Sequence, residues 1–199
     1  MTPASGIVAV ARVFVLLCWM GFFLPFLWKK GRAKETTARR ALASRLGIVL
    51  QGCGYFLMWF FNTSTVSWAA LHLPAAVVWG LCVVAMLLAA GSAWMGFAAI
   101  RALGRQWSLE ARVLEGHRMV VEGPYSHVRH PIYTAMLGML VSAGIVFSVW
   151  WALIGAVVIY SIGTAVRVRA EEGLLREAFG EDFEAYARYV PAVVPRWRA

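Results

Sequence analysis

Charged residues divide this chain into long apolar stretches and short polar ones. No Lys, Arg, Asp or Glu occurs from Leu46 to Ile100, from Pro131 to Val166, or from Val13 to Trp28. A helix needs about 20 residues to cross the hydrocarbon core of a bilayer. The first stretch therefore accommodates two spans, the second two short spans, and the third, extended back past Arg12, one. The pattern predicts an all-α integral membrane protein with five transmembrane helices.

Turn-forming residues indicate where the apolar stretches are interrupted. The run Asn-Thr-Ser-Thr at 62–65 should end the second helix, and Leu73-Pro74 should begin the third. A weaker break falls at Phe147-Ser148. Because no internal repeat or flexible linker is visible, the whole chain is expected to form one domain. Its residues 1–100 would hold three spans, and its residues 101–199 the other two together with the polar motifs.

Basic residues are confined to alternate connecting segments. Every Lys and Arg except Arg12, and every acidic residue, lies within 29–45, 101–130 or 167–199. The positive-inside rule places these segments in the cytoplasm and the amino terminus outside, with the carboxyl terminus cytosolic. The first span lacks a basic start, so it is expected to be retained rather than cleaved. We therefore expect a multi-pass protein of a prokaryotic inner or plasma membrane.

The composition agrees with this assignment. Hydrophobic residues make up 61% of the chain and charged residues 15%, whereas soluble domains contain about 45–50% and about 25%. These values exclude a soluble globular enzyme and a disordered chain. The net charge of +9 follows from topology and contact with anionic membrane lipids, with no nucleic-acid partner expected. The cysteines Cys18, Cys53 and Cys82 lie in apolar runs and are expected to pack as small hydrophobic residues.

A dense polar cluster precedes the predicted fourth helix, from His117 to Tyr133. Gly123-Pro124 predicts a turn, and Pro131 is suited to the first turn of a helix. The segment should form an irregular loop on the membrane surface, with free backbone N–H and C=O groups that suit a ligand. His130 and Tyr133 would share one face of the helix start. Anchoring at the membrane interface explains each polar residue singly but not their density.

A second polar cluster ends the predicted fifth helix. Arg167 and Glu171 are spaced i,i+4, and Glu172 follows directly. Beyond them an apolar stripe predicts an amphipathic helix, with Gly180 as a break. Solvated ion pairs account for its remaining charges, among them Arg176, Glu177, Glu184 and Arg188. Arg167 and the two glutamates instead lie where the helix leaves the bilayer, where partly buried charges require partners.

The order of these motifs resembles the isoprenylcysteine carboxyl methyltransferase family, and parts of it resemble the related membrane phospholipid methyltransferases. The motifs are Arg129-His130-Pro131-Ile132-Tyr133, Arg167-x-x-x-Glu171-Glu172-x-x-Leu175, Phe179-Gly180-Glu181-Asp182-Phe183-x-x-Tyr186, and Pro195. They cover roughly residues 117–197, and the amino-terminal half matches only in its hydrophobic character. The chain departs from the family at Ala135, where Gly is common, and at Val121-Glu122, where Ser or Thr often precedes Gly123.

The resemblance implies an integral-membrane methyltransferase that holds S-adenosylmethionine on the cytosolic side and releases S-adenosylhomocysteine. The implied cofactor-binding residues are His117, Arg118, Met119, Val120, Tyr125, His130, Pro131, Ile132, Tyr133, Glu171 and Glu172. Arg167 would face the acceptor, and Arg167 and Glu171 would be the catalytic residues. The acceptor would be the carboxylate of a prenylcysteine-like or other lipophilic molecule, although a lipid amine, a small thiol or an isoprenoid acid would also fit.

This chemistry suits the residue types. A sulfonium is already a strong electrophile, so catalysis is mostly alignment and desolvation of the nucleophile. A carboxylate acceptor needs a cation to hold it, and arginine offers a planar fork. Tyr133 or Trp107 could pack near the sulfonium. No metal is expected, because no cysteine lies near the histidines.

Two alternatives remain open. The first is a membrane reductase of the sterol-reductase type using NADPH, whose extra phosphate Arg112, Arg118 or Arg129 could bind. The short chain and the spacing of the glutamate pair favour methyl transfer over this reading. The second is a membrane scaffold or transporter without enzymatic activity. It predicts polar groups along a path through the membrane, whereas Gln51 and Asn62 are the only amides in the predicted spans.

Overall fold

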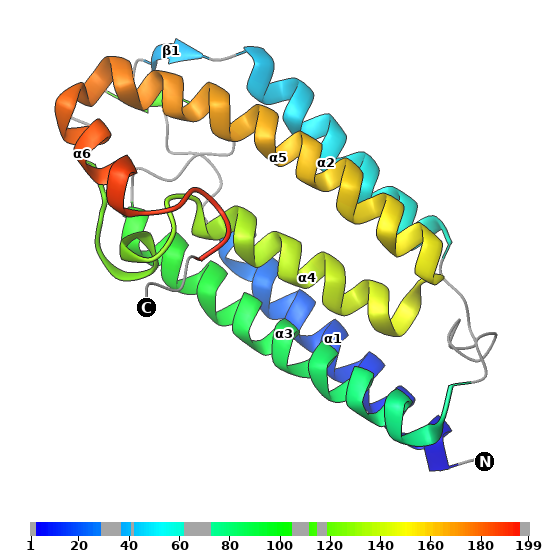
Figure 1. Ribbon diagram of the computed structural model, residues 1–199. Helices are drawn as coiled ribbons and strands as arrows, with labels where there is room; N and C mark the ends of the chain where they lie inside the picture. The colour runs from blue at the N-terminus through cyan, green and yellow to red at the C-terminus, as the bar shows by residue number, and fades with distance from the viewer. Residues whose placement is uncertain are drawn as a thin grey trace.

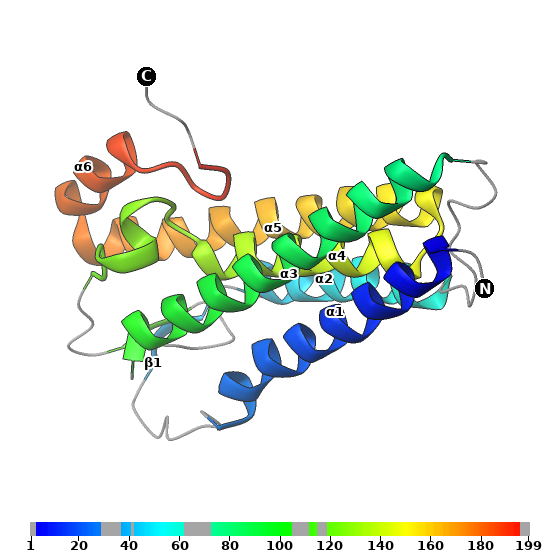
Figure 2. The same ribbon diagram turned by 90° about the horizontal axis from the view of Figure 1, so that it is seen from below.

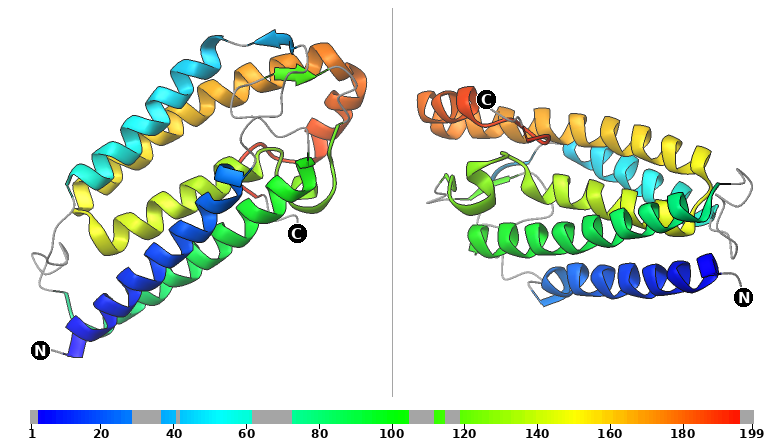
Figure 3. Two further views of the ribbon diagram at one scale, coloured as in Figure 1. Left: turned by 180° about the vertical axis from the view of Figure 1, so that it is seen from behind. Right: turned by 60° about the horizontal axis from the view of Figure 1, so that its bottom comes forward.

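The computed structural model describes residues 3–28, 37–40, 42–61, 73–104, 112–114 and 119–195. Within these ranges, five long helices run side by side (Figures 1 and 3): α1 (Pro3–Trp28), α2 (Leu42–Phe60), α3 (Ala75–Leu103), α4 (Pro131–Phe147) and α5 (Trp150–Phe179). A short 3₁₀ helix, η3 (Gly123–Ser126), and a further helix, α6 (Glu181–Tyr189), lie at one end of the bundle. The amino terminus lies at the opposite end (Figure 2).

The helices begin and end close to the predicted breaks. Pro74 caps α3, and Ser148 separates α4 from α5. Gly180 separates α5 from α6 with φ of 52°, a left-handed conformation that glycine adopts at little cost. These three breaks confirm the sequence prediction. The predicted turn at 62–65 lies outside the described residues.

α4 is the central helix of the bundle. None of its 17 residues is exposed, whereas its neighbours expose large apolar side chains. Examples of exposed apolar residues are Met20 on α1, Phe56 on α2, Trp94 on α3 and Ile154 on α5. An apolar exterior of this extent is expected where lipid tails, rather than water, surround the protein.

Three of the described helices are long and apolar enough to cross a membrane: Ser5–Leu24, Ala75–Leu103 and Trp150–Phe179. α4 is equally apolar but shorter, with a length of about 25 Å at about 1.5 Å per residue. A central helix that other helices enclose does not need to match the lipid thickness by itself. The described residues thus include three candidate membrane spans by length and composition, as expected of a membrane protein.

Two tyrosine hydroxyl groups attach the central helix to the α2–α5 pair. Tyr55 on α2 donates a hydrogen bond to the carbonyl oxygen of Met136 at 2.6 Å. Tyr160 on α5 donates to the carbonyl oxygen of Tyr133 at 3.0 Å. A buried phenol requires such a partner because no water is available in the bilayer interior. The two bonds fix how α4 sits against α2 and α5.

Arg12, the lone charge of the first span, lies beside the end of α4. Its Nε donates to the carbonyl oxygen of Val146 at 2.9 Å, and its guanidinium carbon lies 5.5 Å from the centroid of the Phe147 ring. Carbonyl groups in the last turn of a helix lack intrahelical partners and carry partial negative charge. Arg12 therefore stabilises the end of α4, which explains a charge within an apolar helix.

One feature of the fold was not predicted. β1 (Thr37–Arg40) pairs antiparallel with β2 (Arg112–Leu114), with Thr37 opposite Leu114 and Arg40 opposite Arg112. This short pair joins the segment before α2 to the segment after α3, at the end of the bundle that carries α6 (Figure 3). Apart from it, the described residues confirm the predicted all-α class.

Candidate active site

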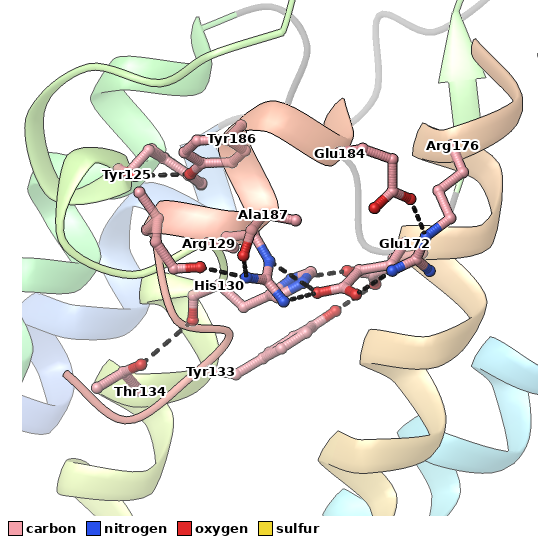
Figure 4. A network of polar contacts seen from close by, with 12 residues as sticks. Tyr125, Arg129, His130, Tyr133, Thr134, Glu172, Arg176, Glu184, Tyr186 and Ala187 are labelled. Carbon is pink, nitrogen blue, oxygen red and sulfur yellow. Dashed lines mark hydrogen bonds and ion pairs between the residues drawn. The ribbon is translucent and has the colours of Figure 1, made fainter. Parts of the chain in front are cut away.

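The loop before α4 forms a compact turn. Gly123 has φ of 61°, and the Val128 amide donates to the carbonyl oxygen of Pro124 at 3.2 Å. The turn buries Tyr125, and burial raises the pKa of its phenol, which therefore stays neutral. The Tyr186 hydroxyl on α6 donates to the carbonyl oxygen of Tyr125 at 2.6 Å (Figure 4). Loop and α6 are thus packed together.

The segment after α6 returns to the same loop. The Arg129 amide donates to the carbonyl oxygen of Pro191 at 2.8 Å, and the His130 amide donates to that of Ala192 at 2.9 Å. The Thr134 hydroxyl donates to the carbonyl oxygen of Val193 at 2.6 Å. The bond from the His130 amide satisfies the residue that caps α4, and all three bonds hold the segment after α6 against the start of α4.

Arg129 connects the loop to α5 and to the end of α6. Its Nε and Nη2 donate to Glu172 Oε1 at 2.9 and 2.7 Å, and its Nη1 donates to the carbonyl oxygens of Ala187 and Val190 (Figure 4). These contacts account for the Arg129 side chain without a role as an interface anchor. The side chain is 12% exposed and all three guanidinium nitrogens are engaged inside the protein.

His130 lies between the two glutamates of α5. Its Nδ1 is 3.4 Å from Glu171 Oε2, and its Nε2 is 3.4 Å from Glu172 Oε1. Burial alone would lower the pKa of His130, but hydrogen bonding and charge attraction from both carboxylates outweigh it and raise the pKa. The imidazole also stacks on the Tyr133 ring, with centroids 5.6 Å apart and planes 8° apart.

Tyr133, Arg167 and Glu171 meet beside this histidine. The Tyr133 hydroxyl donates to Glu171 Oε1, and Arg167 Nη2 donates to the same oxygen at 3.3 Å. The Arg167 guanidinium carbon lies 4.8 Å from the Tyr133 ring centroid, within range of a cation–π contact. Of the two glutamate side chains, Glu171 is 20% exposed and Glu172 8%. Glu171 is therefore the carboxylate more accessible to a ligand.

An apolar cavity of about 80 Å³ adjoins this polar cluster, and Arg129 belongs to both. It is lined by Leu103, Met119, Val120, Tyr125, Arg129, Leu175, Phe183 and Tyr186. Residues from α3, the loop, α5 and α6 thus converge on one space. The space is smaller than the roughly 300–1,000 Å³ of typical ligand pockets, so it forms one apolar wall of the candidate site rather than a complete pocket.

The structure brings together most of the site residues predicted from the sequence. Met119, Val120 and Tyr125 line the cavity, and five others form the polar cluster: His130, Tyr133, Arg167, Glu171 and Glu172. Pro131 is buried in the first turn of α4, and Ile132 is half-buried there. His117, Arg118 and Trp107 lie outside the described residues.

Three further residues contribute to the site without having been predicted for it. Gln51 contacts Arg167, Tyr160 contacts the backbone of Tyr133, and Tyr186 lines the cavity. Gln51 was noted only as a rare amide in an apolar span. An amide at such a position is costly unless paired, so this was the available signal. Within the described residues, no three His, Cys, Asp or Glu side chains gather as a metal site requires.

Comparison with known proteins matches a part of the chain that includes many of these residues. The isoprenylcysteine carboxyl methyltransferase (ICMT) family model matches residues 83–177. Protein-S-isoprenylcysteine O-methyltransferase B of Arabidopsis thaliana is 32% identical over 99 residues, which cover 49% of this chain and 50% of that protein. The match confirms the resemblance that the motifs indicated.

Two bacterial proteins are similar over a stretch of comparable length. The nickel-cobalt-cadmium resistance protein NccN of Alcaligenes xylosoxydans xylosoxydans is 36% identical over 98 residues, covering 47% of this chain and 44% of that protein. The cobalt-zinc-cadmium resistance protein CzcN of Cupriavidus metallidurans is 35% identical over 96 residues, with the same coverage. The chain thus spans about half the length of the curated relatives it matches.

Proposed function

Because residues 83–177 match the isoprenylcysteine carboxyl methyltransferase family model, we propose that this chain transfers a methyl group from S-adenosylmethionine to a lipophilic acceptor at the cytosolic membrane surface. The observation that carries the proposal is the meeting of Tyr133, Arg167 and Glu171 next to Glu172, whose partner Arg129 lines an apolar cavity. It supplies a cation, a carboxylate and an apolar space at the charged end of a membrane bundle.

The residue types around the site suit the chemical groups of S-adenosylmethionine. The cavity walls, with Tyr125 and Phe183 among them, suit a flat aromatic base, and Glu171 suits a cationic group because its side chain is partly exposed. When bound, the cofactor supplies a methyl group on an electrophilic sulfonium. Glu172 is already occupied by Arg129 and Arg176, so we assign it to holding the site together.

Arg167 is proposed to hold the carboxylate of the acceptor. Arg167 as a whole is 5% exposed. It lies on the part of α5 where the apolar stretch ends. An acceptor with a lipid tail would keep the tail among apolar side chains and present its carboxylate to this fork. Low water content around Arg167 strengthens such a contact and desolvates the nucleophile.

The proposal includes five membrane crossings with the amino terminus outside. It is supported by the position of the amino terminus at the opposite end of the bundle from the site (Figure 1), and by the confinement of charges to alternate segments. α2 and α4 would then cross together with the three longer helices. In this arrangement the site faces the cytosol.

Purified protein in detergent tests the function in two steps. Calorimetric titration should show binding of S-adenosylhomocysteine and no binding of NADPH. Radiolabelled S-adenosylmethionine should then methylate N-acetyl-S-farnesylcysteine in preference to a lipid amine or a small thiol. Binding of NADPH instead would favour the reductase alternative. Failure to bind any of these molecules would favour the scaffold alternative.

A further inference from the structure

Gln51 is a buried amide on α2, outside the part of the chain that matches the family. Gln51 is 3% exposed, and both the nitrogen and the oxygen of its amide contact α5. Nε2 donates to Thr164 Oγ1 at 2.9 Å, and Oε1 accepts from Arg167 Nη1 at 3.2 Å. The amide is therefore satisfied in an environment where an unpaired polar group would be costly.

Gly47 on α2 and Gly163 on α5 allow the contact between Gln51 and Arg167, because the two helices approach closely at these glycines. A Cβ atom at Gly47 would lie 2.3 Å from Arg167 Cγ and 2.7 Å from the carbonyl oxygen of Gly163. A Cβ atom at Gly163 would lie 2.9 Å from the backbone nitrogen of Gln51. The Arg167 side chain thus occupies space that any larger residue at position 47 would take. Close backbone approach at glycines is a common way to pack helices in membranes.

The contact with Gln51 holds one side of the Arg167 guanidinium, while the other side contacts Glu171 and Tyr133. Nη1 is bound by Gln51, and Nη2 donates to Glu171 Oε1 at 3.3 Å, with the guanidinium over the Tyr133 ring. Arginine has many rotamers, so its direction in a site depends on such fixed contacts. Removing Gln51 would remove one of the polar contacts that set this direction.

We infer that Gln51 is a positioning residue, which orients the Arg167 guanidinium toward the methyl acceptor from the amino-terminal half of the chain. The inference rests on the proposed function, in which Arg167 holds the acceptor carboxylate. A misplacement of about 1 Å in a catalytic group costs up to about 100-fold in rate. Gln51 therefore affects the rate with bound substrates more than the affinity for the cofactor.

The first test compares Gln51→Met with Gln51→Glu, using S-adenosylmethionine and N-acetyl-S-farnesylcysteine. Methionine keeps the shape but removes both polar contacts, and it should lower kcat by about 10- to 100-fold. The KM for S-adenosylmethionine and the Kd for S-adenosylhomocysteine should stay unchanged. Glutamate keeps an oxygen that accepts from Arg167, but its buried negative charge competes with the acceptor carboxylate, so it should raise the KM for N-acetyl-S-farnesylcysteine. Full kcat in Gln51→Met would overturn the inference.

A matched pair of glycine variants separates orientation from helix packing. Gly47→Ala would displace the Arg167 side chain, whereas Gly155→Ala, on the same interface, would place its Cβ 3.1 Å from Leu57 Cδ2 and not near Arg167. Both should lower the melting temperature, but only Gly47→Ala should lower kcat strongly. Equal losses of kcat in the two variants would assign the effect to packing and contradict a positioning role.

A double-mutant cycle provides a measurement that does not need activity. Unfolding in detergent is measured for the wild type, Gln51→Met, Arg167→Met and the double variant. Contact between the two side chains predicts non-additive changes, and additive changes would contradict it. If the wild-type protein methylated no acceptor, the proposed function would fail, while the cycle would still decide whether Gln51 holds Arg167.

Discussion

Arg129 and Glu172 are 43 positions apart, yet two hydrogen bonds of 2.9 and 2.7 Å join the Arg129 guanidinium to one oxygen of the Glu172 carboxylate. The pair links the loop before α4 to α5, and both side chains are largely buried. The adjacent Glu171 contacts Tyr133 and Arg167 instead. The two neighbouring carboxylates thus share His130 but otherwise have different partners, Arg129 and Arg176 for Glu172 and Tyr133 and Arg167 for Glu171.

Arg129→Met should destabilise the protein strongly. It leaves the buried Glu172 carboxylate without its main cation, a change that typically costs about 3–5 kcal/mol of unfolding free energy. The measurement is denaturant unfolding in detergent. Arg176→Ala serves as the control, because its contact with Glu172 is 47% exposed on the arginine side and should contribute about 1 kcal/mol or less. Equal effects of the two variants would contradict the structural role of Arg129.

Tyr125→Ala should weaken binding of S-adenosylhomocysteine, whereas Tyr125→Phe should leave it nearly unchanged. The aromatic ring lines the cavity, and because burial raises the pKa of the phenol, the hydroxyl carries no charge that could be lost. Calorimetric titration of both variants and of the wild type gives the comparison. Wild-type affinity in the alanine variant would place the cofactor elsewhere.

The stability contributed by His130 should fall as the pH rises. Its pKa is raised in the folded protein, so the stabilising charge is fully present below about pH 6.5, the ordinary value for histidine, and is lost as the pH passes the folded value. The difference in melting temperature between the wild type and His130→Gln should therefore be larger at about pH 6 than at about pH 9. A difference that grows with pH would show that the imidazole is held neutral.

Arg167→Ala should lower the rate of methyl transfer far more than the affinity for the cofactor. Loss of a charge-assisted contact to the reacting group is expected to raise the activation free energy by about 2–4 kcal/mol. Arg167→Lys should recover only part of the rate, because lysine lacks the planar fork. The measurement is the rate of methyl transfer by the wild type and both variants at saturating S-adenosylmethionine. Full activity in the alanine variant would show that the acceptor site lies elsewhere.

Labelling of single cysteines should place Ala76 and Ala178 on opposite sides of the membrane. Both residues are exposed, and they lie near the start of α3 and the end of α5. After replacement of Cys18, Cys53 and Cys82, Ala76→Cys should react with a membrane-impermeant reagent from outside and Ala178→Cys only after the membrane is opened. Reaction of both from the same side would refute the five-span topology.

The sequence alone determined the membrane class, the breaks near Pro74, Ser148 and Gly180, and the residues that carry the family motifs. These features are local. A stretch without charge, a proline at a helix start and a glycine after a helix act through their immediate neighbours, so their meaning does not depend on how the helices pack. Motifs with a fixed spacing can likewise be recognised along the chain, even where the sequence does not show which residues their side chains contact.

Only the tertiary structure decided which of these residues meet. The contacts of Arg129 with Glu172 and of Gln51 with Arg167, and the pairing of β1 with β2, join residues far apart in the chain. Such contacts depend on how closely and at what register helices approach, as at Gly47, where the missing side chain leaves room for Arg167. Apolar spans can pack against one another in many ways, and hydrophobicity does not distinguish between them in a bilayer. The fit of side chains and the need to pair buried charges select one arrangement, and both act only in three dimensions.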